Sequence, residues 1–116
     1  MKNFDYHKKA ELPHLRATVY FADMSKLQGI EHWGSAYTMV MGEPKKDMRL
    51  DIIVFVKDIL KSKEFDLSPI ISHEIVHVLQ ILCEERAMKF EDEVEHCAYI
   101  MTYLMNVFND DLKAKE

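Results

Sequence analysis

The stretch Ser68–Cys83 reads SPIISHEIVHVLQILC, and from here on the hydrophobic pattern of the chain has a helical period. Its apolar positions recur at intervals of three and four, which is typical of an amphipathic helix that packs on a sheet. These positions are Ile71, Ile75, Val78, Leu79 and Leu82. Ser68 can cap free amides at a helix start, and Pro69 suits the first helical position because its missing N–H has no partner there. We predict a helix over residues 69–85.

A second long helix is predicted over residues 91–108. It begins in the acidic run Glu91–Glu93, because carboxylates favour the positive end of the helix dipole. Its expected core face consists of Val94, Cys97, Met101, Leu104 and Phe108.

The first half of the chain carries strand patterns. Residues 15–21 alternate between apolar and polar, as expected of a half-buried strand. Residues 32–41 are rich in aromatic and small residues, and after the polar turn 42–47 comes a β-branched run over residues 49–56, so the two form a predicted hairpin. Three strands followed by two helices predict an α+β fold, with the helices on one side of a small antiparallel or mixed sheet.

Composition narrows the class of protein. The 116 residues fit a single domain, 1–116, and 48% hydrophobic with 30% charged residues is a globular composition. A net charge of -5 gives no electrostatic footprint for nucleic acid. No apolar run is long enough to span a membrane, and residues 1–12 lack the apolar stretch of a signal peptide. With only Cys83 and Cys97, both expected as reduced thiols in facing core positions, we expect a cytoplasmic protein without membrane or nucleic-acid partners.

The predicted first helix contains the motif His73-Glu74-Ile75-Val76-His77, or HExxH. Residues four apart lie on one helical face, so both imidazoles can reach one Zn²⁺ at about 2.0–2.1 Å. Glu74 points about 100° further round, where a carboxylate can act as a base on a water molecule. The alternative is a pair of structural histidines that are hydrogen-bonded without any metal.

A catalytic zinc site needs a third protein ligand if one position is to stay open for water. Glu95 follows His77 by 18 residues, and a turn between the helices permits an antiparallel return to the histidines. Asp92 and His96 compete with Glu95 for this role, since only one face of the second helix can meet the pair. For the whole acidic run the alternative is a solvated helix start.

With these residues the chain resembles the gluzincins, thermolysin-like metallopeptidases that have HExxH on one helix and a Glu ligand on a following helix. The resemblance covers roughly residues 51–104. The chain is also similar to short uncharacterised zincin-like proteins, many from phages or prophages, in which HExxH precedes Glu-x-x-Ala-Tyr, here Glu95–Tyr99. The resemblance implies a minimal zincin-like fold in which His73, His77 and Glu95 bind Zn²⁺ and Glu74 is the general base.

The sequence also departs from the gluzincin pattern. Larger gluzincins carry an acid four residues after the Glu ligand, where it holds a ligand histidine. Here that position is Tyr99, which either orients a ligand through its hydroxyl or is a core aromatic. The C-terminal domain that holds their transition-state donor has no counterpart, so the candidates for that role are Tyr103, Tyr37 and His96.

The remaining histidines and Trp33 are not assigned to the predicted metal site. His7, His14 and His32 have no partner spacing and are expected at the surface or at an edge. Trp33, with Tyr37, either packs in the core or forms a wall of the substrate cleft.

The leading functional hypothesis is a zinc-dependent metallopeptidase whose substrate is a peptide or protein. An extended peptide would add as a strand along a sheet edge formed by residues 32–41. The alternative is a non-catalytic zinc-binding interaction module of phage or bacterial origin, which the small size favours. A third hypothesis is a metal-free α+β domain. A phage-encoded chain would act in the host cytoplasm.

Overall fold

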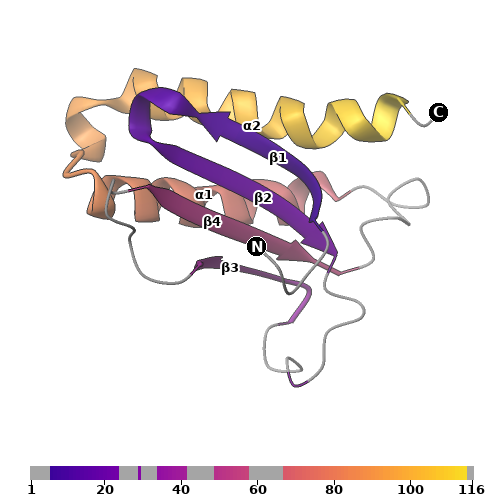
Figure 1. Ribbon diagram of the computed structural model, residues 1–116. Helices are drawn as coiled ribbons and strands as arrows, with labels where there is room; N and C mark the ends of the chain where they lie inside the picture. The colour runs from indigo at the N-terminus through magenta and orange to yellow at the C-terminus, as the bar shows by residue number, and fades with distance from the viewer. Residues whose placement is uncertain (1–5, 24–28, 30–33, 42–48, 58–66, 115–116) are drawn as a thin grey trace.

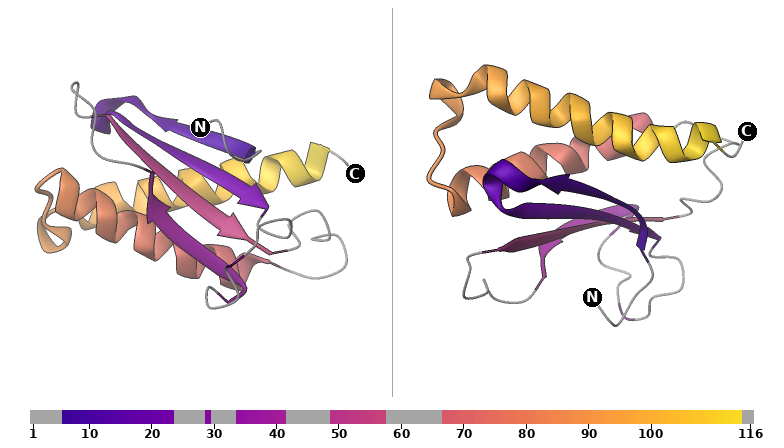
Figure 2. Two further views of the ribbon diagram at one scale, coloured as in Figure 1. Left: turned by 60° about the horizontal axis from the view of Figure 1, so that its bottom comes forward. Right: turned by 45° about the horizontal axis from the view of Figure 1, so that its top comes forward.

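The computed structural model describes residues 6–23, 29, 34–41, 49–57 and 67–114, and these form one mixed sheet with two long helices on one of its faces (Figures 1 and 2). The strands are β1 (Tyr6–Leu12), β2 (Ala17–Asp23), β3 (Ala36–Val40) and β4 (Leu50–Val56). Their order in the sheet is β1-β2-β4-β3. β1 pairs antiparallel with β2, β3 pairs antiparallel with β4, and the two central strands are parallel. Among the described strands, β1 and β3 therefore form the two edges.

The α+β class with helices on one face is confirmed, but the predicted three strands are four. The strand that the sequence analysis missed, β1, reads YHKKAEL. It has no apolar run because it is an edge strand whose buried side chains include only Ala10 and Leu12 among those described. The short 3-10 helix η1 (Pro13–Leu15) connects it to β2, so that β2 begins at Ala17 and not at residue 15.

The predicted hairpin is confirmed in its pairing. β3 and β4 are antiparallel, with Thr38 opposite Val54 and Ala36 opposite Val56. Residues 32 and 33, which belong to the first strand of the predicted hairpin, lie outside the described residues, and so does the predicted turn 42–47.

Helix α1 (Ser68–Glu85) agrees with the predicted range except at its start. The prediction that Ser68 caps the helix is wrong. Ser68 is already helical, and Leu67 occupies the cap position without a side-chain hydrogen bond to the helix end. Pro69 lies within the first two positions, where its missing N–H does no harm.

Helix α2 (Val94–Ala114) begins three residues after the predicted start and continues beyond the predicted end. The acidic run contributes instead to the 3-10 helix η4 (Phe90–Asp92). Glu93 separates the two helices because its backbone, at φ −133° and ψ 37°, is not helical.

The core lies between the sheet and the helices. The predicted apolar stripe of α1 is buried, and so are Cys97, Leu104 and Phe108 of α2. Phe108 contacts Phe21 of β2 edge to face, with ring centroids 5.4 Å apart. Val94, predicted to be in the core, is 47% exposed, so the core face of α2 begins at Cys97.

Cys83 of α1 and Cys97 of α2 are free thiols that face each other across the helix pair. Burial raises the pKa of the Cys97 thiol, and its hydrogen-bonded neighbour Cys83 raises it further. Within the described part of the chain, no helix is both long enough and apolar enough to cross a bilayer.

Candidate metal centre

Three side chains of α1 form a group that could hold a metal ion. The ligand atoms of His73, Glu74 and His77 all lie within 4.8 Å of one another. The two imidazole rings, one helical turn apart, have centroids 5.1 Å apart and planes tilted by 71°. Both histidines are exposed on the outer flank of the helix, and Glu74 is the buried member at 6% exposure. The clustering that HExxH predicts is therefore present.

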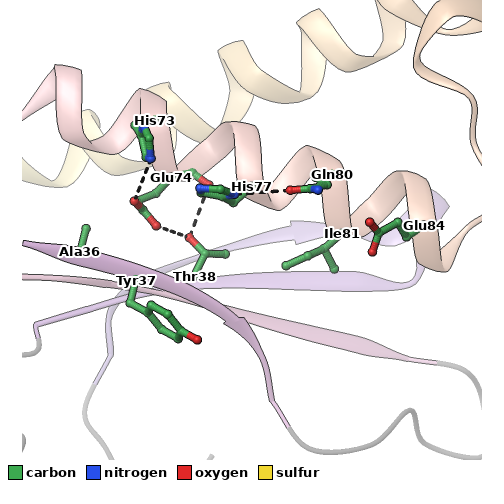
Figure 3. Close-up of a pocket in the computed structure, with 9 residues that line it drawn as sticks. All are labelled: Ala36, Tyr37, Thr38, His73, Glu74, His77, Gln80, Ile81 and Glu84. Atoms are coloured by element: carbon green, nitrogen blue, oxygen red, sulfur yellow. Dashed lines mark hydrogen bonds and ion pairs between the residues drawn. The ribbon is translucent and has the colours of Figure 1, made fainter. Parts of the chain in front are cut away.

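Thr38 of β3 holds the Glu74 carboxylate in place. Its hydroxyl donates a hydrogen bond of 2.7 Å to Glu74 Oε1, and Glu74 Oε2 lies 3.9 Å from His73 Nε2 (Figure 3). A buried carboxylate needs such a donor because it has lost water. One oxygen is thus fixed by the strand, and the other is near the first histidine.

Gln80 has a comparable effect on His77. Its amide oxygen lies 3.4 Å from His77 Nδ1, a long hydrogen bond in which a protonated Nδ1 donates. Such a bond fixes the tautomer and leaves the lone pair on Nε2, the arrangement usual for a metal-binding imidazole.

The group borders a cleft of about 430 Å³ between α1 and the edge strand β3. The lining consists of residues 36–38 of β3 together with His73, Glu74, His77, Gln80, Ile81 and Glu84 of α1 (Figure 3). A second hollow of about 330 Å³ adds Ser35, Pro69 and Ile70 to the lining around His73 and Glu74. Open space therefore extends along the helix from its first turn past both histidines.

Glu95, the predicted third ligand, is not part of this group. It is exposed in the first turn of α2, which packs on the other flank of α1. Cys83 is the residue of α1 that contacts Cys97 of α2. At 100° per residue, Cys83 and His77 point about 120° apart around α1, so α2 and the histidines lie on different sides of this helix. The structure does not bring Glu95 to the histidines, and its role as a ligand stays a prediction without geometric support.

The other predicted site residues are also dispersed. Tyr99 and Tyr103 are 69% and 41% exposed on α2 and do not line the cleft. Tyr37 is among the lining residues, but its ring points away from the histidines (Figure 3). Asp92 is exposed in η4, and His96 contacts His14. Trp33 and His32 lie outside the described residues, as does the His7 side chain.

Sequence reasoning missed Thr38 and Gln80. Gln80 had a local signal, because residues three apart on a helix are neighbours. Thr38 had none, since 36 residues separate it from Glu74 and only the packing of β3 beside α1 brings them together.

The chain matches no family model, no curated protein and no solved structure, so the ground for assigning a function is the geometry of His73, Glu74 and His77.

Proposed function

We propose that the protein binds Zn²⁺ through His73 and His77 and hydrolyses peptide bonds in the cleft between α1 and β3. The observation that carries the proposal is the convergence of two imidazoles and one carboxylate within 4.8 Å at the wall of that cleft. Imidazole nitrogens suit zinc, whereas magnesium and calcium prefer all-oxygen sites. Zinc in such a site supplies Lewis acidity that polarises a carbonyl and lowers the pKa of water.

Glu74 would act as the general base. Thr38 holds its Oε1, so Oε2 is the oxygen available to accept a proton from water. The same carboxyl group then donates that proton to the leaving amine. His77, oriented by Gln80, keeps its Nε2 free as a ligand.

The edge strand β3 suits a peptide substrate. β3 pairs with β4 on one side, and it is the outermost strand of the sheet among those described. An extended peptide can add to such an edge through main-chain hydrogen bonds. It would then lie beside Ala36 and Thr38, which line the cleft with the histidines.

One observation favours the non-catalytic alternative, a zinc-binding interaction module. Glu74 belongs to the same ligand group as the histidines, and within the described residues no other acid joins it there. If Glu74 is itself the third ligand, no base is left for hydrolysis. The two hypotheses therefore differ in what Glu74 does.

Metal content and hydrolysis of a peptide library would be measured for the wild type, His77→Ala, Glu74→Gln and Glu84→Gln. The last variant is the matched control, because Glu84 is an exposed acid of the same cleft. If the protein is a peptidase, we expect His77→Ala to contain one zinc fewer per chain than the wild type. We also expect Glu74→Gln to keep the metal but to lose about 10²–10⁴-fold in hydrolysis, the usual contribution of a general base. Glu84→Gln should behave as the wild type.

The outcomes separate the hypotheses. If both His77→Ala and Glu74→Gln lack the zinc, and neither the wild type nor any variant hydrolyses peptides, Glu74 is a ligand of a non-catalytic site. Equal zinc in the wild type and His77→Ala would reject both and leave a structural histidine pair.

A further inference from the structure

A second pair of histidines lies outside the cleft, where η1 meets the first turn of α2. His14 in η1 and His96 in the first turn of α2 have their Nε2 atoms 2.9 Å apart, with ring centroids separated by 5.0 Å. His14 is exposed, as expected from the sequence, but it has a partner that the sequence did not indicate, because His96 lies 82 residues away in the chain. Since η1 joins β1 to β2, this pair belongs to the edge of the sheet opposite β3.

Glu93 orients one ring of the pair. Its carboxylate Oε1 lies 3.3 Å from His96 Nδ1, and a protonated Nδ1 donates to it. The lone pair of His96 then sits on Nε2, directed at His14. A carboxylate behind the far nitrogen is the arrangement that commonly fixes metal-binding histidines.

The segment that carries His14 is held in place. The Arg86 guanidinium donates to the carbonyl oxygens of Leu15, at 2.7 Å, and Arg16, at 3.3 Å. Arg16 itself has a left-handed backbone, with φ at 50°, which closes the turn. On the other side, Cys97, the residue after His96, is buried in the core. Both imidazoles are therefore positioned by rigid structure, and this lowers the entropy lost on binding a ligand.

We propose that His14 and His96 form a second metal site, for a divalent transition metal such as Zn²⁺, with Glu93 as the positioning residue. Two nitrogens that each lie about 2.0–2.1 Å from one tetrahedral ion are about 3.3–3.4 Å apart, so the two rings would need to separate by only about half an ångström from the observed 2.9 Å. Both rings are partly open to solvent, so water can fill the remaining coordination positions. The ion would cross-link η1 to α2. The proposal does not depend on the function proposed for the cleft.

The test uses the full chain with the first pair removed, His73→Ala/His77→Ala. Zinc would be titrated into this protein by calorimetry at about pH 7.5, because metal ligands must be deprotonated. We expect one zinc per chain, a melting temperature that rises with zinc, and no response to Mg²⁺. Adding His14→Ala or His96→Ala should abolish binding. Glu93→Gln should weaken it roughly tenfold to a hundredfold, the usual effect of losing such a partner.

Glu91→Gln is the matched control, since Glu91 is an exposed acid of the adjacent η4. This substitution should leave zinc binding unchanged. Absence of zinc binding in the His73→Ala/His77→Ala protein, or equal binding after His96→Ala, would overturn the proposal and leave a direct histidine–histidine hydrogen bond.

If the alanine variants unfold, His96→Gln keeps a hydrogen-bonding side chain. The imidazole nitrogen resonances of the His73→Ala/His77→Ala protein then give an independent reading. Zinc must shift those of His14 and His96, and unmoved resonances would also overturn the proposal.

Discussion

The hydroxyl of Thr38 is the donor that the structure provides to the buried Glu74 carboxylate. Thr38→Val keeps the shape of the side chain but removes this donor. We expect a loss of about 1–3 kcal/mol in the free energy of unfolding, because a buried carboxylate would lose a charge-assisted hydrogen bond. Urea denaturation measures the loss. Thr102→Val is the control, since Thr102 is an exposed residue of α2 whose change should stay within about 0.5 kcal/mol. Equal stability of Thr38→Val and wild type would show that the bond contributes nothing.

At the scale of single residues, what the sequence could predict was local. HExxH placed His73, Glu74 and His77 together because a helix alone determines that spacing. The bonds of Thr38 to Glu74 and of His14 to His96 join residues 36 and 82 positions apart, respectively. Such contacts follow from how strands and helices pack, which no periodicity in one sequence specifies.

Helix α2 is fastened to the sheet by the edge-to-face contact of Phe108 with Phe21, both almost completely buried. Phe108→Ala would leave a cavity between the two layers and should lower the free energy of unfolding by about 3–5 kcal/mol. Tyr99→Ala removes an aromatic ring from the exposed side of the same helix and should have little effect. The comparison is made by chemical denaturation. Similar losses in the two variants would contradict the core position of Phe108.

Elements with a strong period could be predicted, and those without one could not. The stripe of α1 located that helix because five apolar residues share one buried face. β1 was not predicted because an edge strand with charged residues has little apolar signal. The start of α2 was misplaced because an acidic run suits a 3-10 turn as well as a helix, and the backbone of Glu93 decides between them.

Within the part of the chain that the structure describes, one histidine pair lies on α1 beside the edge strand β3 and another joins η1 to α2, and both are proposed to bind zinc. Zinc added to metal-free protein should therefore raise the melting temperature in two additive parts, one lost with His73→Ala/His77→Ala and the other with His14→Ala/His96→Ala. Saturation at 100 times the dissociation constant stabilises by about 2.7 kcal/mol per site. That corresponds to about 10 °C per site in a domain of this size. A variant lacking all four histidines that still responded equally to zinc would contradict both assignments.

The parallel pairing of β2 with β4 affects the order in which the chain folds. β1 with β2, and β3 with β4, are each joined locally and can form as separate hairpins. Residues 17–23 meet residues 50–56 only when the chain between them has closed into a large loop that includes β3. Because non-local pairing has to overcome loop-closure entropy first, we expect docking of the two hairpins to limit the folding rate. The cleft beside β3 would then be among the last features to form, because it needs β3 fixed in the sheet as well as α1 packed against it.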